Sequence, residues 1–170
     1  MNFAGQELVD IVDRDDRVLY QCSRAEMRKD VLRHRAVFVA VISSSGQLLI
    51  HERSANKDLW PGWWDLAVGG VVASGETYDD AARRELDEEI GVSVGSINFL
   101  GAGLYDDPDV SLVGHCYWVA HDGPFHLRDG EVTRTEWATR AELWELMGTR
   151  RFLPDSRALL VPLLTDIFTS

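Results

Sequence analysis

One stretch of the chain, from Gly69 to Val92, restricts the fold more than any other part of the sequence. It reads GGVVASGETYDDAARRELDEEIGV and passes from an apolar strand through a short glycine-containing loop into a helix. Thr77 is the expected N-cap, with Asp80 in the capping-box position three residues later, and Gly91 suits the left-handed geometry that ends a helix. An apolar stripe of this helix would face the core, and its members are Ala82, Leu86 and Ile90.

Three carboxylates of the same helix, Glu85, Glu88 and Glu89, are spaced i, i+3 and i+4. This spacing places them on one helical face, within an arc of roughly 100°. Like charges so close repel one another, at a few tenths of a kcal/mol per pair. A divalent cation would offset the repulsion, and carboxylate oxygens suit Mg²⁺ or Mn²⁺ better than zinc. From the spacing alone, a metal site and a solvated acidic helix are equally good interpretations.

The full pattern resembles the signature of the Nudix hydrolases, G-x5-E-x7-R-E-U-x-E-E-x-G-U, in which U is an aliphatic residue. Nine specified positions across 23 residues match, and both spacers have the right length. The matching residues are Gly70, Glu76, Arg84, Glu85, Leu86, Glu88, Glu89, Gly91 and Val92. The resemblance implies Mg²⁺-dependent hydrolysis of a diphosphate linkage in a nucleoside diphosphate derivative or a related small phosphorylated metabolite. It also implies an α/β fold of the Nudix type, an α/β/α sandwich with a central mixed β-sheet.

The resemblance also implies roles for individual residues. Glu85 and Glu89 would bind the main Mg²⁺, Glu88 would complete the site or hold a second ion, and the backbone carbonyl of Gly69 would be a further ligand. Such a metal neutralises developing charge and lowers the pKa of a bound water. Related enzymes differ in whether a glutamate of the signature or one from a later loop deprotonates this water. The catalytic candidates are therefore Glu88, Glu89 and Glu131.

Four further residues of the signature have structural roles in this interpretation. Glu76 and Arg84 would pair and hold the loop against the helix. Gly70 and Gly91 would serve the backbone geometry on either side of the helix.

Residues 53–66 are expected to form a loop that turns at Pro61-Gly62. Arg53 and Lys57 are its candidate contacts to a substrate phosphate. The loop also contains three of the six tryptophans, Trp60, Trp63 and Trp64. These side chains either cover the edge of the sheet or form a rim that stacks a base or covers a substrate tail.

The remaining segments supply the rest of the sandwich. An apolar run over 36–43 predicts a buried central strand, with 47–53 as its partner strand. Further strands are expected in a hairpin over 7–22 and at 97–105, 110–121 and 131–137, and helices at 24–32, 140–147 and from 154 onward. Asp155 is the expected cap of the last helix, which Pro162 would kink or shorten.

Composition sets limits on the partners. The chain of 170 residues is expected to form one domain, 1–170, and its 45% hydrophobic content is that of a globular protein. A net charge of −11 argues against binding to a nucleic acid polymer. We expect no signal peptide and no membrane span. Cys22 and Cys116 are expected to be free thiols in a reducing cytoplasm. The oligomeric state stays open, a homodimer included.

Within the Nudix superfamily, the chain looks most like the branch related to isopentenyl-diphosphate isomerase. The similar segments are ELVDIVDRDDRVL, LRHRAVFVAV, GQLLIHERS, K-x2-WPGWWD and GEV…EW. The departures concern the isomerase's own chemistry. Gly69 stands at the position of its catalytic cysteine, Val71 at that of a metal-binding histidine, and its acidic pair falls near Leu112 and Gly114. Of its metal-binding histidines, His34 alone retains a match.

These departures favour diphosphate hydrolysis on an isomerase-like scaffold. Two alternatives of other classes remain, a non-catalytic ligand sensor and an isopentenyl-diphosphate isomerase. Loss of the signature carboxylates would favour the sensor, and none is lost. Coenzyme A pyrophosphatase and ADP-ribose hydrolase are narrower alternatives among the hydrolases.

Overall fold

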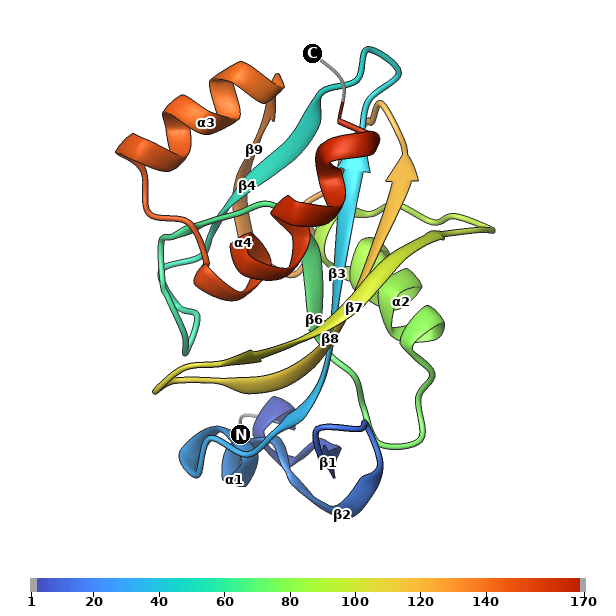
Figure 1. The fold of residues 1–170 in the computed structure, drawn as a ribbon, viewed down its shortest axis with the longest axis vertical. Helices are drawn as coiled ribbons and strands as arrows, with labels where there is room; N and C mark the ends of the chain where they lie inside the picture. Colours follow the sequence, from blue (N-terminus) through green and yellow to red (C-terminus); the bar gives the residue numbers. More distant parts are fainter. Residues whose placement is uncertain (1–2, 169–170) are drawn as a thin grey trace.

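The computed structural model describes residues 3–168, and within them the chain forms one nine-stranded sheet with helices packed against it (Figure 1). The predicted domain also included residues 1–2 and 169–170, which lie outside the described residues. The strands are β1 (Leu8–Val12), β2 (Val18–Ser23), β3 (His34–Ile42), β4 (Leu48–Arg53), β5 (Trp64–Asp65), β6 (Val68–Val71), β7 (Asn98–Asp106), β8 (Ser111–Ala120) and β9 (Val132–Ala138). The helices are α1 (Arg24–Lys29), α2 (Tyr78–Ile90), α3 (Arg140–Thr149) and α4 (Pro154–Leu160), with 3-10 helices η1 (Phe3–Gln6) and η2 (Val161–Asp166).

Strand β3 is the centre of the sheet. It pairs in parallel with β8 along its whole length and antiparallel with β6 on its other edge. The predicted mixed sheet is therefore confirmed. The prediction that 47–53 is the partner strand of 36–43 is wrong beyond a single residue pair, Ile42 with Leu48. Because β6 and β8 occupy the edges of β3, β4 pairs along its length with β9 instead.

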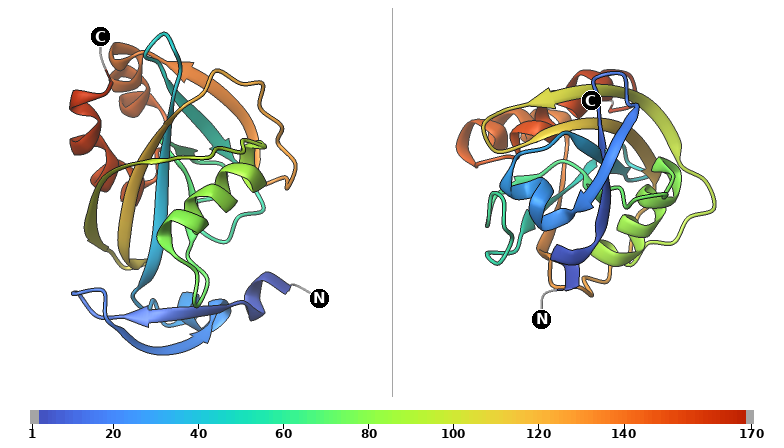
Figure 2. Two further views of the ribbon diagram at one scale, coloured as in Figure 1. Left: turned by 90° about the vertical axis from the view of Figure 1, so that its right-hand side faces the viewer. Right: turned by 90° about the horizontal axis from the view of Figure 1, so that it is seen from below.

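Helices cover both faces of the sheet, which confirms the predicted sandwich. Alternate residues of β3 face opposite sides: Val37, Val39 and Val41 join the apolar cluster under α2, while Phe38 and Ile42 join the cluster under α3 and α4. Figure 2 shows α2 on one side of the sheet and α4 on the other. Burial on both faces explains why the sequence of β3 is an almost continuous apolar run.

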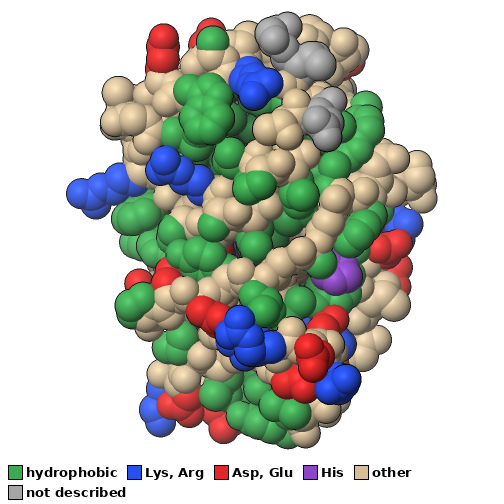
Figure 3. All heavy atoms as spheres, viewed as in Figure 1, with side chains coloured by type: hydrophobic (Ala, Val, Ile, Leu, Met, Phe, Trp, Pro, Cys, Tyr) green, Lys and Arg blue, Asp and Glu red, His purple; other side chains and the backbone are tan. Residues whose placement is uncertain are grey.

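The N-terminal hairpin β1–β2 and helix α1 pack at one end of the sheet, at the bottom of Figure 1. Ser23 caps α1 and accepts a hydrogen bond from the Glu26 N–H at 3.2 Å. The helix ends at Lys29, earlier than predicted, and Val31 adopts a left-handed φ of 50° before the chain enters β3. Charged side chains gather between this end and β8, whereas apolar side chains gather over α3 and α4 (Figure 3).

The C-terminal helices depart from expectation at one residue. Thr139 begins α3 with a complete capping box, as predicted. The prediction that Asp155 caps the last helix is wrong, because Leu153 is the N-cap and Pro154 takes the first helical position. Asp155 instead lies buried in the first turn. Helix α4 ends at Leu160 and continues as η2, so the expected shortening near Pro162 is confirmed.

Two predictions about the whole chain can be compared with the described residues. Among the helices of residues 3–168, none combines the length and the apolar character that a membrane crossing requires. Cys22 and Cys116 are unpaired and buried, as expected of free thiols.

Candidate active site

The box, residues 70–92, folds as a loop followed by α2. Thr77 caps the helix and accepts a hydrogen bond from the Asp80 N–H at 3.1 Å, while its hydroxyl donates to the Asp80 carboxylate at 2.7 Å. Gly91 ends the helix with φ 69° and ψ 30°, the predicted left-handed geometry. The predicted core stripe is confirmed, and each of its members is 0% exposed: Ala82, Leu86 and Ile90. This packing turns the carboxylate face of α2 toward β6.

Two of the three box carboxylates are buried. Glu85 is 6% exposed and Glu89 is 2% exposed, whereas the side chain of Glu88 is about half exposed. Burial raises the pKa of Glu85, and burial together with the nearby Glu85 raises the pKa of Glu89 well above its usual range. Oε2 of Glu89 is buried and has no hydrogen-bond partner among residues 3–168. The site therefore holds excess negative charge that a cation would stabilise.

Arg84 organises the other carboxylates of the box. Its Nε and Nη2 donate to the two oxygens of Glu76 at 2.8 and 3.0 Å, so the expected ion pair is present. Its Nη1 donates to Glu85 at 2.8 Å and to Glu88 at 3.1 Å. The hydrogen bonds to Glu76 raise the pKa of Arg84. Because Nη2 also donates to the Val71 carbonyl at 3.2 Å, Arg84 ties the loop and the helix to β6.

Two adjacent glycines of β6 form the wall opposite these carboxylates. A Cβ atom on Gly70 would overlap the Glu85 carboxylate. A Cβ atom on Gly69 would overlap the backbone carbonyl of Val37, because Gly69 pairs with Phe38 of β3. The position aligned with the isomerase's catalytic cysteine therefore has no room for a side chain, even the smallest.

Lys57 and Glu131 approach the box helix from distant parts of the chain. Lys57, a predicted phosphate contact, forms an ion pair with Glu131, and its Nζ lies 4.0 Å from Oε1 of Glu89. The structure thus brings both residues to the carboxylates of α2. Arg53, the other predicted phosphate contact, lies farther along: its Nη2 donates to the Leu59 carbonyl at 3.3 Å, and its buried Nε has no partner.

Two hollows meet at Gly69 and Gly70. A depression of about 330 Å³ contains the Glu85 and Glu88 side of the box together with Lys57. A smaller cavity of about 70 Å³ also has both glycines in its lining. The polar side chains that line this cavity come from several elements, and they include Arg24, Arg28, His34, Arg53 and Asp155.

Sequence inspection missed five charged residues of the cavity, namely Arg24, Arg28, Asp58, Asp65 and Asp155. No local pattern marks the arginines, because the residues that they face lie far away in the sequence. Asp155 is 6% exposed, and burial beside Asp65 raises its pKa to about 7. Burial beside Arg28 lowers the pKa of His34 to about 4, so this imidazole is neutral at pH 7.

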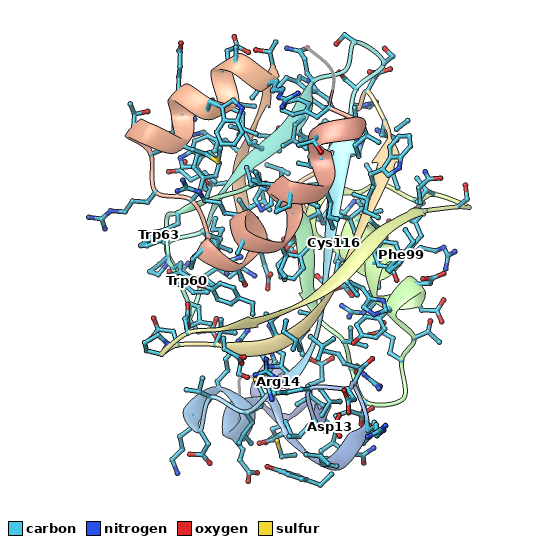
Figure 4. The ribbon with its side chains drawn as sticks, viewed as in Figure 1. Asp13, Arg14, Trp60, Trp63, Phe99 and Cys116 are labelled. Atoms are coloured by element: carbon cyan, nitrogen blue, oxygen red, sulfur yellow. The ribbon has the colours of Figure 1, made fainter. Side chains whose placement is uncertain are left out.

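The tryptophans of the 53–66 loop have different environments. Trp64 lies in β5 and is 4% exposed, within the apolar core. Trp60 and Trp63 lie side by side on the loop, with ring centroids 6.4 Å apart (Figure 4). Trp60 has a left-handed φ of 48°, packs against the core and lines the cavity of about 70 Å³. Trp64 therefore covers apolar surface, which is one of the two predicted roles, whereas Trp60 also reaches the cavity beside the box.

The donor atoms of the site fit a hard divalent cation, although they are not gathered around one point. Within residues 3–168, no three acidic, histidine or cysteine side chains are arranged to hold a metal ion. Glu88 turns toward Arg84 instead. The buried oxygens of Glu85 and Glu89 are nevertheless ligands of the kind that Mg²⁺ prefers, and Oε2 of Glu89 lacks any other partner.

The positions of the isomerase's acidic pair hold no substitute. The β3–β8 register places Leu112 beside His34 and Gly114 beside Ala36. Neither Leu112 nor Gly114 can donate or accept a proton through its side chain.

Comparison with known proteins gives a consistent result. The family model described as NUDIX domain matches residues 32–157. The protein named uncharacterized Nudix hydrolase YfcD, from Salmonella typhi, is 36% identical over 164 residues, which cover 95% of this chain and 87% of that protein. The crystal structure of DR0079 from Deinococcus radiodurans has a TM-score of 0.77 at 29% identity and covers 96% of this chain and 100% of that one. The NUDIX domain of Shewanella oneidensis NrtR, solved with ADP ribose, has a TM-score of 0.62 at 18% identity, over 79% and 87% of the two chains, and supports the fold alone.

Proposed function

We propose that this chain, which belongs to the Nudix family of hydrolases that act on pyrophosphate bonds, cleaves a diphosphate linkage in a nucleoside diphosphate derivative or a related small phosphorylated metabolite with Mg²⁺ as cofactor. The observation that supports this most is the buried pair Glu85 and Glu89, whose pKa values burial raises and one of whose oxygens has no partner. Such a pair destabilises the fold unless it serves a cationic ligand.

The chain's own residues divide the work of binding and proton transfer. Glu85, Glu89 and the carbonyl of Gly69 would hold the metal, and Glu88 would join them by leaving Arg84. Mg²⁺, when bound there, neutralises phosphoryl oxygens and acidifies a coordinated water. Glu88, Glu89 and Glu131 are the candidates that accept the proton of the attacking water.

The cationic residues act on the phosphates and on the scaffold. Lys57, now paired with Glu131, would turn to a phosphoryl oxygen, and Arg53 would contact the substrate from the cavity side. Arg84 positions Glu85 through its Nη1 and holds the loop through Glu76.

The alternatives from the sequence fare differently. An isomerase is disfavoured because the Gly69 position has no room for a proton donor. A sensor is disfavoured because every box carboxylate is retained. We further propose that residues 1–170 act as one domain. We also propose that the protein works in the cytoplasm, because two buried free cysteines suit a reducing compartment.

The test is a screen of nucleoside diphosphates, nucleotide sugars, ADP ribose and non-nucleoside diphosphates with Mg²⁺ or Mn²⁺, in which released phosphate, pyrophosphate or nucleoside monophosphate is measured. We expect turnover with at least one class and its loss on chelation. Turnover that persists after exhaustive chelation would contradict the metal dependence. Enzyme-dependent deuterium uptake from heavy water into isopentenyl diphosphate, followed by NMR, would contradict the hydrolase assignment.

A further inference from the structure

We propose that the small arginine-lined cavity beside the box is a subsite for a compact phosphoryl end group, so that the enzyme prefers a terminal diphosphate to one that carries bulky groups on both sides. This inference rests on the proposed function and names the class of substrate.

The cavity and the box site share a wall, so one diphosphate can reach both. Gly69 and Gly70 line the cavity as well as the box depression, and so do Arg24 and Lys57. The two hollows therefore adjoin one another at these four residues. A diphosphate held at Glu85 therefore has its next phosphoryl group within reach of the cavity.

The two hollows differ greatly in size. The cavity measures about 70 Å³, whereas sites that enclose whole small-molecule ligands typically measure about 300 to 1,000 Å³. The cavity therefore admits a small group and is too small to enclose a nucleoside. A further hollow of about 380 Å³ shares Arg24, Lys57 and Glu131 with the box depression, and Arg24, Arg28, Lys57 and Asp58 with the cavity. A bulky substituent has room in the box depression and in this hollow, outside the cavity itself.

The cavity wall is suited to an anion. Arg24, Arg28 and Arg53 line it together with Lys57. Among residues 3–168, the buried Nε of Arg53 has no hydrogen-bond partner, whereas the Nε of Arg28 forms an ion pair with Asp58 at 3.4 Å. Guanidinium groups bind phosphate through several N–H donors, so these arginines are suitable ligands for an anion in the cavity.

Three carboxylates also line the cavity, and each is engaged or neutralised in part. Asp58 lies at the surface, with 58% of its side chain exposed, 3.4 Å from Nε of Arg28. Asp65 accepts hydrogen bonds from the N–H groups of Leu66 and Ala67. The pKa of Asp155 is raised to about 7 by burial, so near neutral pH a large fraction of this carboxyl is uncharged. The lining, with four cationic side chains and three carboxylates, therefore has a small positive balance, and Arg24 and Lys57 also pair with Glu7 and Glu131 beside it.

Two of the arginines come from a segment that the NUDIX domain match does not include. The match begins at residue 32, and Arg24 and Arg28 lie one helical turn apart on α1. The helix is held against the sheet by Met27, which is 1% exposed and joins the apolar cluster of the hairpin. The N-terminal segment thus completes the cavity and would set the preference for one substrate end.

The test compares two substrates that share a base, a nucleoside 5′-diphosphate and the corresponding dinucleoside 5′,5′-diphosphate. We expect kcat/KM of the wild-type enzyme to be at least tenfold higher for the nucleoside diphosphate. Arg28→Gln should lower that value about 10- to 100-fold, mainly through KM, and lower the dinucleoside value less, because Arg28 also lines the larger hollow. Lys29→Gln is the matched control, because Lys29 is exposed on the same helix and does not line the cavity; it should change neither value. Circular dichroism would verify folding, which is expected because the partner Asp58 is already in solvent.

A binding measurement separates this inference from the proposed function. Calorimetric titration with inorganic phosphate should show at least tenfold weaker binding to Arg28→Gln than to the wild type or Lys29→Gln. If neither nucleotide is hydrolysed but phosphate binding depends on Arg28, the subsite stands and the proposed function fails. The subsite is wrong if hydrolysis occurs and Arg28→Gln leaves the phosphate affinity unchanged. It is also wrong if Arg28→Gln lowers kcat/KM for both substrates by the same factor.

Discussion

The box helix and the arginine-lined cavity meet at the same two glycines but are assembled in opposite ways. The box site takes Glu85, Glu88, Glu89 and Arg84 from one continuous stretch, residues 70–92, and Lys57 and Glu131 join them from elsewhere in the chain. The cavity takes side chains from α1, from the end of β4 and its loop, and from α4. The comparison suggests that chemistry here is encoded locally, whereas substrate choice depends on how distant segments pack together.

The largest effect on activity is expected when one carboxylate of the box is removed. Glu89→Gln should lower kcat by about 10²- to 10³-fold, the cost typical of losing one group that stabilises a transition state. The fold should be at least as stable as the wild type at pH 7, because burial raises the pKa of Glu89 and the amide carries no charge. Steady-state kinetics and urea unfolding measure the two effects.

A control for this variant lies on the same helix. The Asp87 side chain is about half exposed and accepts a hydrogen bond from Ser93 at 3.0 Å, away from the site. Asp87→Asn should therefore keep kcat within about twofold, since surface substitutions away from special contacts have small effects. Equal losses in both variants would mean that the helix needs its overall charge rather than the Glu89 oxygens.

The second test acts on the cavity side, where a buried acid titrates. Asp155 has a folded pKa of about 7, against an ordinary value of 3.8. Between these two values the folded state keeps a proton that the unfolded state has lost, so the stability of the wild type falls as pH rises from about 4 to 7. Asp155→Asn cannot titrate, and its stability relative to the wild type should increase over that range and level off above pH 7.

The size of this effect follows from the shift of about 3 pH units, which corresponds to an upper bound of about 4 kcal/mol. Urea unfolding of both proteins at pH 5, 6, 7 and 8 measures it. The side-chain amide of the variant would still accept the Ser156 N–H hydrogen bond, which Asp155 accepts at 2.7 Å, so the helix start is preserved. A difference between the proteins that does not change with pH would show that Asp155 keeps an ordinary pKa.

Both regions also show which parts of the structure the sequence could predict. The caps of α2, Thr77 and Gly91, and its buried stripe follow from neighbouring residues, because hydrogen bonds at helix ends and the helical period are local. The central strand was predictable for the same reason, since a continuous apolar run is typical of burial on both faces. The Nudix signature then extended these local predictions to the whole fold.

The failures share a different cause, which is competition between distant segments. The predicted pairing of β4 with β3 holds at one residue pair only, and β4 pairs along its length with β9, because β6 and β8 occupy the edges of β3. Asp155 resembled a helix cap, but Pro154 takes the first helical position and leaves the aspartate in a buried turn facing the cavity. Arg24 and Arg28 looked like surface residues of a short helix, because nothing near them in sequence indicates the wall they join.

The third test acts on the wall that both regions share. Gly69→Ala would place a methyl group on the Val37 backbone, which cannot move without disturbing β3, and we expect a loss of about 1–3 kcal/mol in unfolding free energy. Gly70→Ala would instead displace the Glu85 carboxylate, the far end of a flexible side chain, so stability should fall less and activity should fall more. Thermal unfolding and kcat of both variants measure this contrast. Equal effects on stability would contradict it.

The smallest expected effect comes from a helix that belongs to neither region. Thr139 accepts a hydrogen bond from the Glu142 N–H at 3.3 Å, and the Glu142 carboxylate accepts from the Thr139 N–H at 2.8 Å. Thr139→Ala removes one half of this capping box and should cost about 1 kcal/mol of stability. Because α3 lines neither the box depression nor the cavity, kcat and KM should stay within about twofold of the wild type at a temperature where both proteins are folded. A change in KM at such a temperature would mean that substrate recognition extends across the sheet to α3. The residues that line the cavity and the box depression would then not be enough to explain substrate binding.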